Sequence, residues 1–233
     1  MPKGWGKGFT KETHPSIAKR SKTMRFLKID NFAKWREKQK LAGLIPSSYP
    51  QLIEDGNLAE LIGVVLGDGH IKRYPRTEEL SIFSNSNNPS FIERYSNLIE
   101  KVFNKKPAIR HHHGNGNCTR IRIYQKEIIS RIKIPPNARL NVKFLVPKWI
   151  LRNREYIVRY LRGLYEAEGS HSIHKATYTY KVQFSNKNIS LLKNVFELVS
   201  KLGFHPHKSK YQIQLSKKKE VFEFLELIQF RKY

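Results

Sequence analysis

Cysteine and acidic residues are scarce in this chain, and it has no long apolar run. Cys118 is the only cysteine among 233 residues, so an internal disulfide is impossible and a reducing compartment fits the composition. No apolar stretch approaches the roughly 20 residues that a transmembrane helix needs, and no signal-peptide pattern opens the chain. We therefore expect neither a membrane protein nor a secreted disulfide-rich domain, but an intracellular protein of a prokaryotic cytoplasm or nucleoid, or of an organelle matrix.

The shortage of acids leaves a large excess of positive charge. The chain has 44 Lys and Arg against 19 Asp and Glu, which gives a formal net charge of +25. Such a field attracts polyanions, and nucleic acid is the expected partner. Hydrophobic residues still make up 39% of the chain, so we expect a folded core rather than a basic tail. Composition alone leaves a ribosomal or RNA-coating protein open.

One order of elements occurs twice along the chain, which predicts an internal duplication. We divide the chain into a basic N-terminal extension (1–50), a first repeat (51–140) and a second repeat (141–233). The patterns predict helices at 57–68, 88–103 and 126–132 in the first repeat, and at 157–168, 189–204 and 219–228 in the second. They predict strands at 79–85, 119–125, 177–186 and 211–217. The triplet Phe-Ser-Asn occurs at 83–85 and 184–186, which predicts equivalent positions in the two repeats.

The extension is strongly basic and partly helical by its pattern. We expect helix after Pro15, and a short helix from Asp30 or Asn31 to a stop at Gly43. Residues 8–25 resemble the small helical DNA-binding modules of intron-encoded nucleases. A disordered arm that orders on DNA and an organellar transit peptide are alternatives for this segment.

The first helix of each repeat ends in a single acid followed by glycine. The two stretches are "LIGVVLGDG" (61–69) and "LRGLYEAEG" (161–169). We expect Asn57 to cap the first of these helices, with Glu60 three residues on in a variant of the capping box. The apolar spacing of the first helix is helical, at Leu58, Leu61, Ile62, Val65 and Leu66.

Small residues four apart mark one face of each of these helices. They are Gly63 and Gly67 in the first, and Gly163 and Ala167 in the second. Such faces let two helix backbones approach closely. The acids that end the two helices, Asp68 and Glu168, would then lie side by side. Two adjacent carboxylates repel each other, and we expect a bound divalent cation such as Mg²⁺ to neutralise them.

These two stretches resemble the signature helices of the LAGLIDADG homing endonucleases, in their single-chain, two-repeat form. The resemblance covers roughly 57–233. It implies an α+β fold, in which a duplicated αββαββα unit forms two curved antiparallel sheets about a pseudo-two-fold helix pair. It also implies a monomer that cleaves both strands of double-stranded DNA with Mg²⁺ as its cofactor.

The resemblance assigns roles to individual residues. The implied metal site consists of the carboxylates of Asp68 and Glu168 and the carbonyls of Gly67 and Ala167. Lys187, which follows the second Phe-Ser-Asn, matches the residue that orders the attacking water. The corresponding "FSNSNN" of the first repeat has no lysine, and Lys72 is a weaker candidate there.

Alternating strands offer two polar faces for DNA. The predicted DNA-binding residues are Lys72, with Arg120, Arg122 and Tyr124 on the strand 119–125 and Gln212, Gln214 and Ser216 on the strand 211–217. Arg and Gln suit base edges in the major groove, although any half-buried strand has a polar face. The run His111–His113 is more typical of a hairpin turn than of a zinc site, because neighbours on a strand point to opposite sides. We expect Cys118 to be an unreactive strand or turn residue.

The preferred function is a site-specific, intron-encoded DNA endonuclease. The first alternative is an RNA-binding intron maturase with the same fold, which would bind intron RNA. The second is a non-catalytic DNA-binding regulator, and the presence of both acids argues against it.

Overall fold

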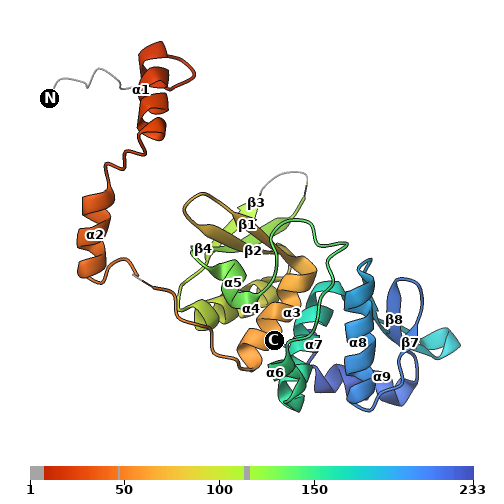
Figure 1. The fold of residues 1–233 in the computed structure, drawn as a ribbon. Coiled ribbons are helices and arrows are strands. Elements are labelled where there is room, and N and C mark those ends of the chain that lie inside the picture. Colours follow the sequence, from red (N-terminus) through yellow and green to blue (C-terminus); the bar gives the residue numbers. More distant parts are fainter. Residues whose placement is uncertain (1–7, 47, 113–115) are drawn as a thin grey trace. The chain divides into compact units, whose positions relative to one another are not determined.

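A computed structural model describes residues 8–46, 48–112 and 116–233, and the chain divides into two compact units, Met1–Tyr49 and Pro50–Tyr233 (Figure 1). The smaller unit contains the helices α1 (Pro15–Phe26) and α2 (Ala33–Leu41), neither of which has a buried residue. Both predicted helices are confirmed, although α2 begins slightly later than expected. Asp30 caps the turn before it, since its carboxylate accepts the N–H of Phe32 at 3.1 Å. None of the helices within the described residues is long and apolar enough to span a membrane.

The larger unit has the predicted order αββαββα twice. The first repeat consists of α3 (Gly56–Asp68), β1 (Gly69–Arg73), β2 (Glu78–Asn85), α4 (Pro89–Phe103), β3 (Ala108–His112), β4 (Cys118–Gln125) and α5 (Ile128–Ile132). The second consists of α7 (Arg154–Glu168), β5 (Gly169–His174), β6 (Thr179–Ser185), α8 (Ile189–Lys201), β7 (His207–Lys208), β8 (Gln212–Leu215) and α9 (Lys218–Leu227). The short helix α6 (Lys148–Leu151) lies between the repeats, and a 3₁₀ turn (Lys175–Thr177) connects β5 to β6. The expected fold class is confirmed.

Each repeat builds one four-stranded antiparallel sheet. The strand orders are β1-β2-β4-β3 and β5-β6-β8-β7, so the two sheets have the same topology. One face of each sheet is buried: Ile121 and Ile123 of β4 are at most 2% exposed, as are Ile213 and Leu215 of β8. The alternation that predicted these strands is therefore the alternation between a core face and an open face. The helices α3 and α7 run side by side between the two sheets (Figure 1).

Strand register corrects the equivalence that the Phe-Ser-Asn triplets suggested. Gly69 pairs with Ile82, whereas Gly169 pairs with Phe184, so Ile82 and Phe184 are the equivalent residues. Phe184 is fully buried, while Phe83 lies on the open face under the guanidinium of Arg120. A shift of one residue along a strand moves a side chain to the other face of the sheet. The triplets are thus one residue out of structural register.

Two further local predictions were wrong. The cap of α3 is Asp55, whose carboxylate accepts the N–H of Leu58 at 2.9 Å; Asn57 lies inside the helix, and Glu60 is fully buried in an ion cluster rather than in a capping box. His111 and His112 belong to β3 and not to a turn, and the imidazole of His111 hydrogen-bonds the hydroxyl of Thr119 at 2.7 Å. His113 lies outside the described residues. Cys118 is a strand residue, as predicted, and begins β4.

Candidate active site

The crossing of α3 and α7 brings their backbones into direct contact. A β-carbon built on Gly63 would overlap the carbonyl oxygen of Tyr160, and one on Gly163 would overlap that of Glu60 and lie 2.7 Å from the nitrogen of Val64. A β-carbon on Gly67 would likewise overlap that of Ala167. The predicted packing through small residues is present along the whole crossing.

This crossing places the two acids together. Asp68 is the last residue of α3 and Glu168 the last of α7, and neither helix has a basic residue in its last turn. Burial raises the pKa of Asp68 to about 7, and the negative charge of Glu168 contributes to the rise. Burial also raises the pKa of Glu168, which the hydrogen bond from Asn186 opposes. Each carboxylate also lies at the negative, C-terminal end of its helix dipole. The negative charge of the pair is therefore unfavourable when no cation is bound.

The surroundings of the two acids differ between the repeats. Asn186 donates from its amide nitrogen to Glu168 at 3.2 Å. Beside them lies a hollow lined by Ser185, Lys187 and residues 209–212. The structure therefore brings Lys187 to the second acid, on an exposed side chain that lines the same hollow.

The first repeat has a different set of cations near its helix end. Lys72 is exposed on β1, with its ammonium 5.0 Å from the ring centre of Tyr74. Arg139, from the segment between the repeats, donates to the carbonyl oxygen of Gly69, next to Asp68. Burial lowers the pKa of His70, and the positive charges of Arg139, Arg120 and Lys72 lower it further. These cations therefore surround one side of the first helix end.

The segment between the repeats is fixed to both of them. The N–H of Asn137 donates to the carbonyl oxygen of Ile71 in the first repeat. Asn188, which caps α8 in the second repeat, donates from its amide to the carbonyl oxygens of Arg139 at 2.9 Å and Val142 at 2.8 Å. Sequence reasoning missed Arg139, Asn186 and Asn188, because their partners lie between 18 and 70 positions away.

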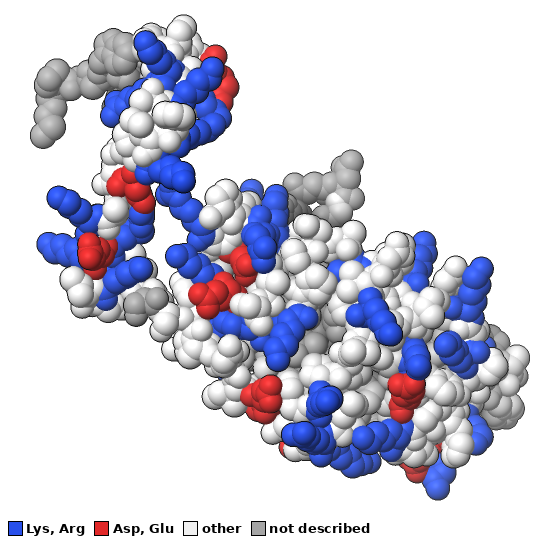
Figure 2. All heavy atoms as spheres, viewed as in Figure 1, with Lys and Arg blue, Asp and Glu red and all other residues white. Residues whose placement is uncertain are grey.

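The open faces of both sheets carry the predicted polar residues. Arg120, Arg122 and Tyr124 alternate with buried residues on β4, as do Gln212 and Gln214 on β8, while Ser216 lies just beyond that strand. Arg120 is braced from below, since its guanidinium donates to the hydroxyl of Ser81 at 2.9 Å and forms an ion pair with the buried Glu79. Basic side chains are also spread over the surface drawn in Figure 2, and acids are few there.

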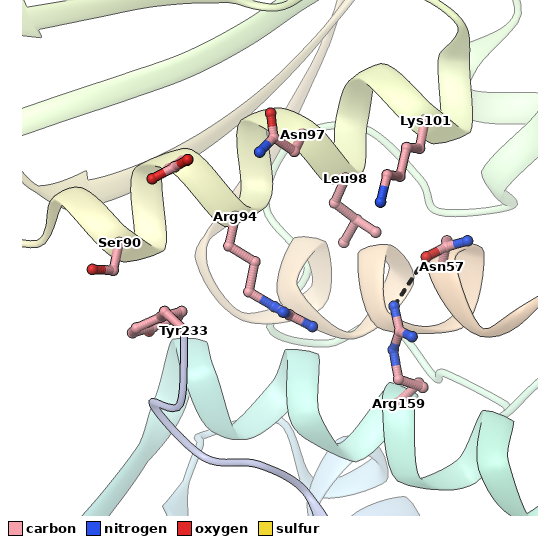
Figure 3. Close-up of a pocket in the computed structure, with 9 residues that line it drawn as sticks. Asn57, Ser90, Arg94, Asn97, Leu98, Lys101, Arg159 and Tyr233 are labelled. Carbon is pink, nitrogen blue, oxygen red and sulfur yellow. Dashed lines mark hydrogen bonds between the residues drawn. The ribbon is translucent and has the colours of Figure 1, made fainter.

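The opposite end of the helix pair carries arginines whose role is structural. Figure 3 shows Arg94 of α4 and Arg159 of α7 pointing into a hollow over α3. Both pair with the fully buried carboxylate of Glu60, Arg94 through two hydrogen bonds of 2.7 and 2.8 Å and Arg159 through one of 2.5 Å. Arg162 lies 3.7 Å from the same carboxylate. This cluster joins α3, α4 and α7 about 12 Å along the helix from the acids, at 1.5 Å per residue.

The two acids fit a hard divalent cation whose coordination would be completed by other oxygen ligands. Among the described residues, no group of three or more His, Cys, Asp or Glu could hold a metal ion, so a closed zinc-type site is absent from them. Paired carboxylates with raised pKa values favour a cation, and Mg²⁺ or Mn²⁺ accepts carboxylate, carbonyl, water and phosphate oxygens. The carbonyls of Gly67 and Ala167 lie in the last helical turns, where carbonyls lack helical partners.

Comparisons with solved structures define the class of fold. Crystal structures of the homing endonuclease I-DmoI are similar: one of its mesophilic variants is 21% identical, with a TM-score of 0.51 over 74% of this chain and 94% of that one. The complex of I-DmoI with DNA and Mn is 20% identical, with the same TM-score over 74% and 96%. The N-terminal LAGLIDADG domain of DUF199/WhiA is 16% identical, with a TM-score of 0.52 over 81% and 87%.

Sequence comparison supports the same family. Residues 155–229 match the LAGLIDADG-like domain family, whereas no curated protein matches the chain significantly. The predicted resemblance is confirmed: the second repeat carries a LAGLIDADG-like domain, and the larger unit, Pro50–Tyr233, has the two-repeat LAGLIDADG fold.

Proposed function

We propose that this protein is a site-specific endonuclease of double-stranded DNA that depends on a divalent metal ion, with Mg²⁺ as the cofactor in the cell. The observation that carries the proposal is the pair of desolvated carboxylates, Asp68 and Glu168, at adjoining helix ends between two polar sheet faces. The similar I-DmoI structures include complexes with DNA and Mn, which supports a metal-dependent reaction on DNA.

The reaction is phosphodiester hydrolysis: a water oxygen bonds to phosphorus, the bond from phosphorus to the leaving oxygen breaks, and the leaving oxygen gains a proton. Asp68 and Glu168 would hold the divalent cation, which would supply charge neutralisation at the phosphate and an activated water. Asn186 holds Glu168 in place from the second repeat. Lys187, on the same hollow, orients the water and offers a positive charge to the phosphate.

The rest of the chain holds the duplex against this centre. One chain supplies both halves of the site, so we propose that a monomer cuts both strands. The open sheet faces contact the grooves, and the N-terminal unit adds positive charge for the phosphate backbone. The first repeat has no lysine equivalent to Lys187, so the cations around His70 serve the phosphate on that side.

The test is cleavage of the intronless form of the gene that encloses the reading frame, with Mg²⁺ and with EDTA. We expect double-strand cuts in Mg²⁺ only, and their loss in Asp68→Asn and Glu168→Gln with DNA binding largely kept. Glu223→Gln, which removes an exposed acid of α9, is the matched control and should cut normally. Wild-type cutting by both acid variants would refute the active site, while duplex binding without any cutting would favour the regulator.

A further inference from the structure

The strand registers make the open faces of the two sheets comparable residue by residue. Ile82 pairs with Ile121 in the first sheet, and Phe184 with Ile213 in the second. With Ile121 aligned to Ile213, three open-face residues of β4 each have an equivalent residue, two in β8 and one just after it. The equivalent pairs are Arg120 with Gln212, Arg122 with Gln214, and Tyr124 with Ser216.

The two faces are chemically different at these positions. On the first face, Ser81 pairs with Arg122, and Arg110 of β3 pairs with Arg120, so both arginines of β4 have polar neighbours on the same side. On the second, Gln183 pairs with Gln214 and donates to its amide oxygen at 2.8 Å. At the three compared positions, the first face carries two guanidinium groups and a phenol, and the second carries two carboxamides and a hydroxyl, with His207 of β7 paired with Gln214.

Arginine and glutamine side chains that are fixed in position select different bases. Arginine donates two hydrogen bonds to the O6 and N7 acceptors of guanine, whereas glutamine both accepts from and donates to adenine at N6 and N7. Arg120 is braced by Glu79 and Ser81, and Arg122 stacks with its guanidinium 5.5 Å from the ring centre of Tyr124. Side chains that are positioned before binding lose less freedom when they contact a base.

The spacing along the strands gives the positions that are read. β1 starts beside Asp68 and runs outward, so Arg120, Arg122 and Tyr124 lie at increasing distances from the acids, and their equivalents do the same beside Glu168. Alternate strand residues are about 6.8 Å apart, which corresponds to about two base pairs at 3.4 Å each. Equivalent base-contacting residues of β4 and β8 therefore lie at matching distances on the two sides of the cut.

We infer that the target is asymmetric in a defined way: guanine contacts dominate the half-site of the first repeat, and adenine contacts dominate the half-site of the second. This inference rests on the proposed function, because it assumes that the open faces lie in the major groove. Arg122 and Gln214 are the specificity-determining pair at the middle position. Exchanging their side chains should exchange the base preference at the two matching positions.

The experiment is a binding selection from a randomised duplex library in EDTA, which needs no cleavage. The wild-type protein should enrich guanine in one half and adenine in the other. Arg122→Gln should change guanine to adenine at one position, and Gln214→Arg should change adenine to guanine at the matching position in the other half, each by about tenfold or more in relative enrichment. Arg152→Gln, an exposed arginine next to α6, is the matched control and should alter no base preference.

The outcomes separate this inference from the proposed function. Halves of equal composition in the wild-type selection, or unchanged preferences in folded Arg122→Gln and Gln214→Arg, would overturn the half-site assignment even if the protein cleaves DNA. A wild-type protein that selects the predicted halves but cannot cleave would support the assignment and refute the nuclease. If Gln214→Arg fails to fold by circular dichroism, Gln212→Arg tests the equivalent position nearer the cut.

Discussion

Without metal, the two-repeat unit should lose stability as the pH rises from 6 to 8, and Asp68→Asn should remove this loss. The pKa of Asp68 is about 7 in the folded protein and about 3.9 in an unfolded chain. The folded state therefore keeps a proton that the unfolded state has released. Its stabilising effect is complete below the unfolded pKa and disappears as the pH rises through 7.

The size of the effect follows from the shift. About three pKa units correspond to a total of about 4 kcal/mol, at 1.36 kcal/mol per unit. The window from pH 6 to 8 contains about 1.4 kcal/mol of this, and partial exposure of Asp68 makes both figures upper limits. With a urea dependence of roughly 2–3 kcal/mol per molar, the unfolding midpoint should shift by about half a molar.

The assay is urea unfolding in EDTA at both pH values, for the wild type, Asp68→Asn and the control Glu223→Gln. Histidines titrate in the same window, so the informative quantity is the difference between the wild type and Asp68→Asn. Equal pH shifts in these two proteins would refute the assigned pKa. Addition of Mg²⁺ at pH 8 should restore the stability of the wild type and leave Asp68→Asn nearly unchanged.

Three further predictions test the helix crossing, the ion cluster around Glu60 and the N-terminal unit. Gly63→Leu and Gly163→Leu should each destabilise the protein by about 3 kcal/mol or more, because even a β-carbon overlaps a backbone oxygen there, while Gly116→Ala, in open space, should be nearly neutral in thermal unfolding. Glu60→Gln should cost about 3–5 kcal/mol by leaving Arg94 and Arg159 without their carboxylate, and unchanged urea unfolding would contradict a structural role for the cluster. Removal of residues 1–45 should leave a folded, metal-dependent protein that binds duplex DNA more weakly. The slope of log affinity against log salt should flatten by about 0.9 for each phosphate that the removed segment had neutralised, and an unchanged slope would show that the segment touches no phosphate.

Periodicity predicted the elements with a strong one-sided pattern and missed the others. The long helices and the inner strands β2, β4, β6 and β8 bury alternate or regularly spaced apolar residues, which local sequence records. The outer strands β1, β3, β5 and β7 were not predicted, because they are short and stretches such as "GHIKR" and "GSHSIH" contain a single large apolar residue each, too few to show alternation. Gly69 was expected only as a helix stop, yet it also begins β1 in an extended conformation.

The acids could be predicted because the duplication repeats them, whereas their neighbours could not. Asp68 and Glu168 end two similar helices, so comparing the repeats was sufficient. Arg139 has no counterpart at an equivalent position, and it reaches Gly69 across 70 positions. The Phe-Ser-Asn triplets misled for a related reason, since a short identity in sequence does not fix the register of a strand.

The direct backbone contact at the crossing of α3 and α7 divides the molecule into parts that can and cannot change independently. No side chain larger than hydrogen fits at Gly63 or Gly163, so a substitution on one helix has no room to be compensated on the other. The polar residues of β4 and β8 on the open faces have no such constraint, because their side chains are partly exposed to solvent. If the proposed function holds, successive mutations on the sheet faces can change which DNA sequence is bound while the paired acids at the helix ends stay as they are. A protein engineer should likewise vary the faces of β4 and β8 and leave the helix crossing alone.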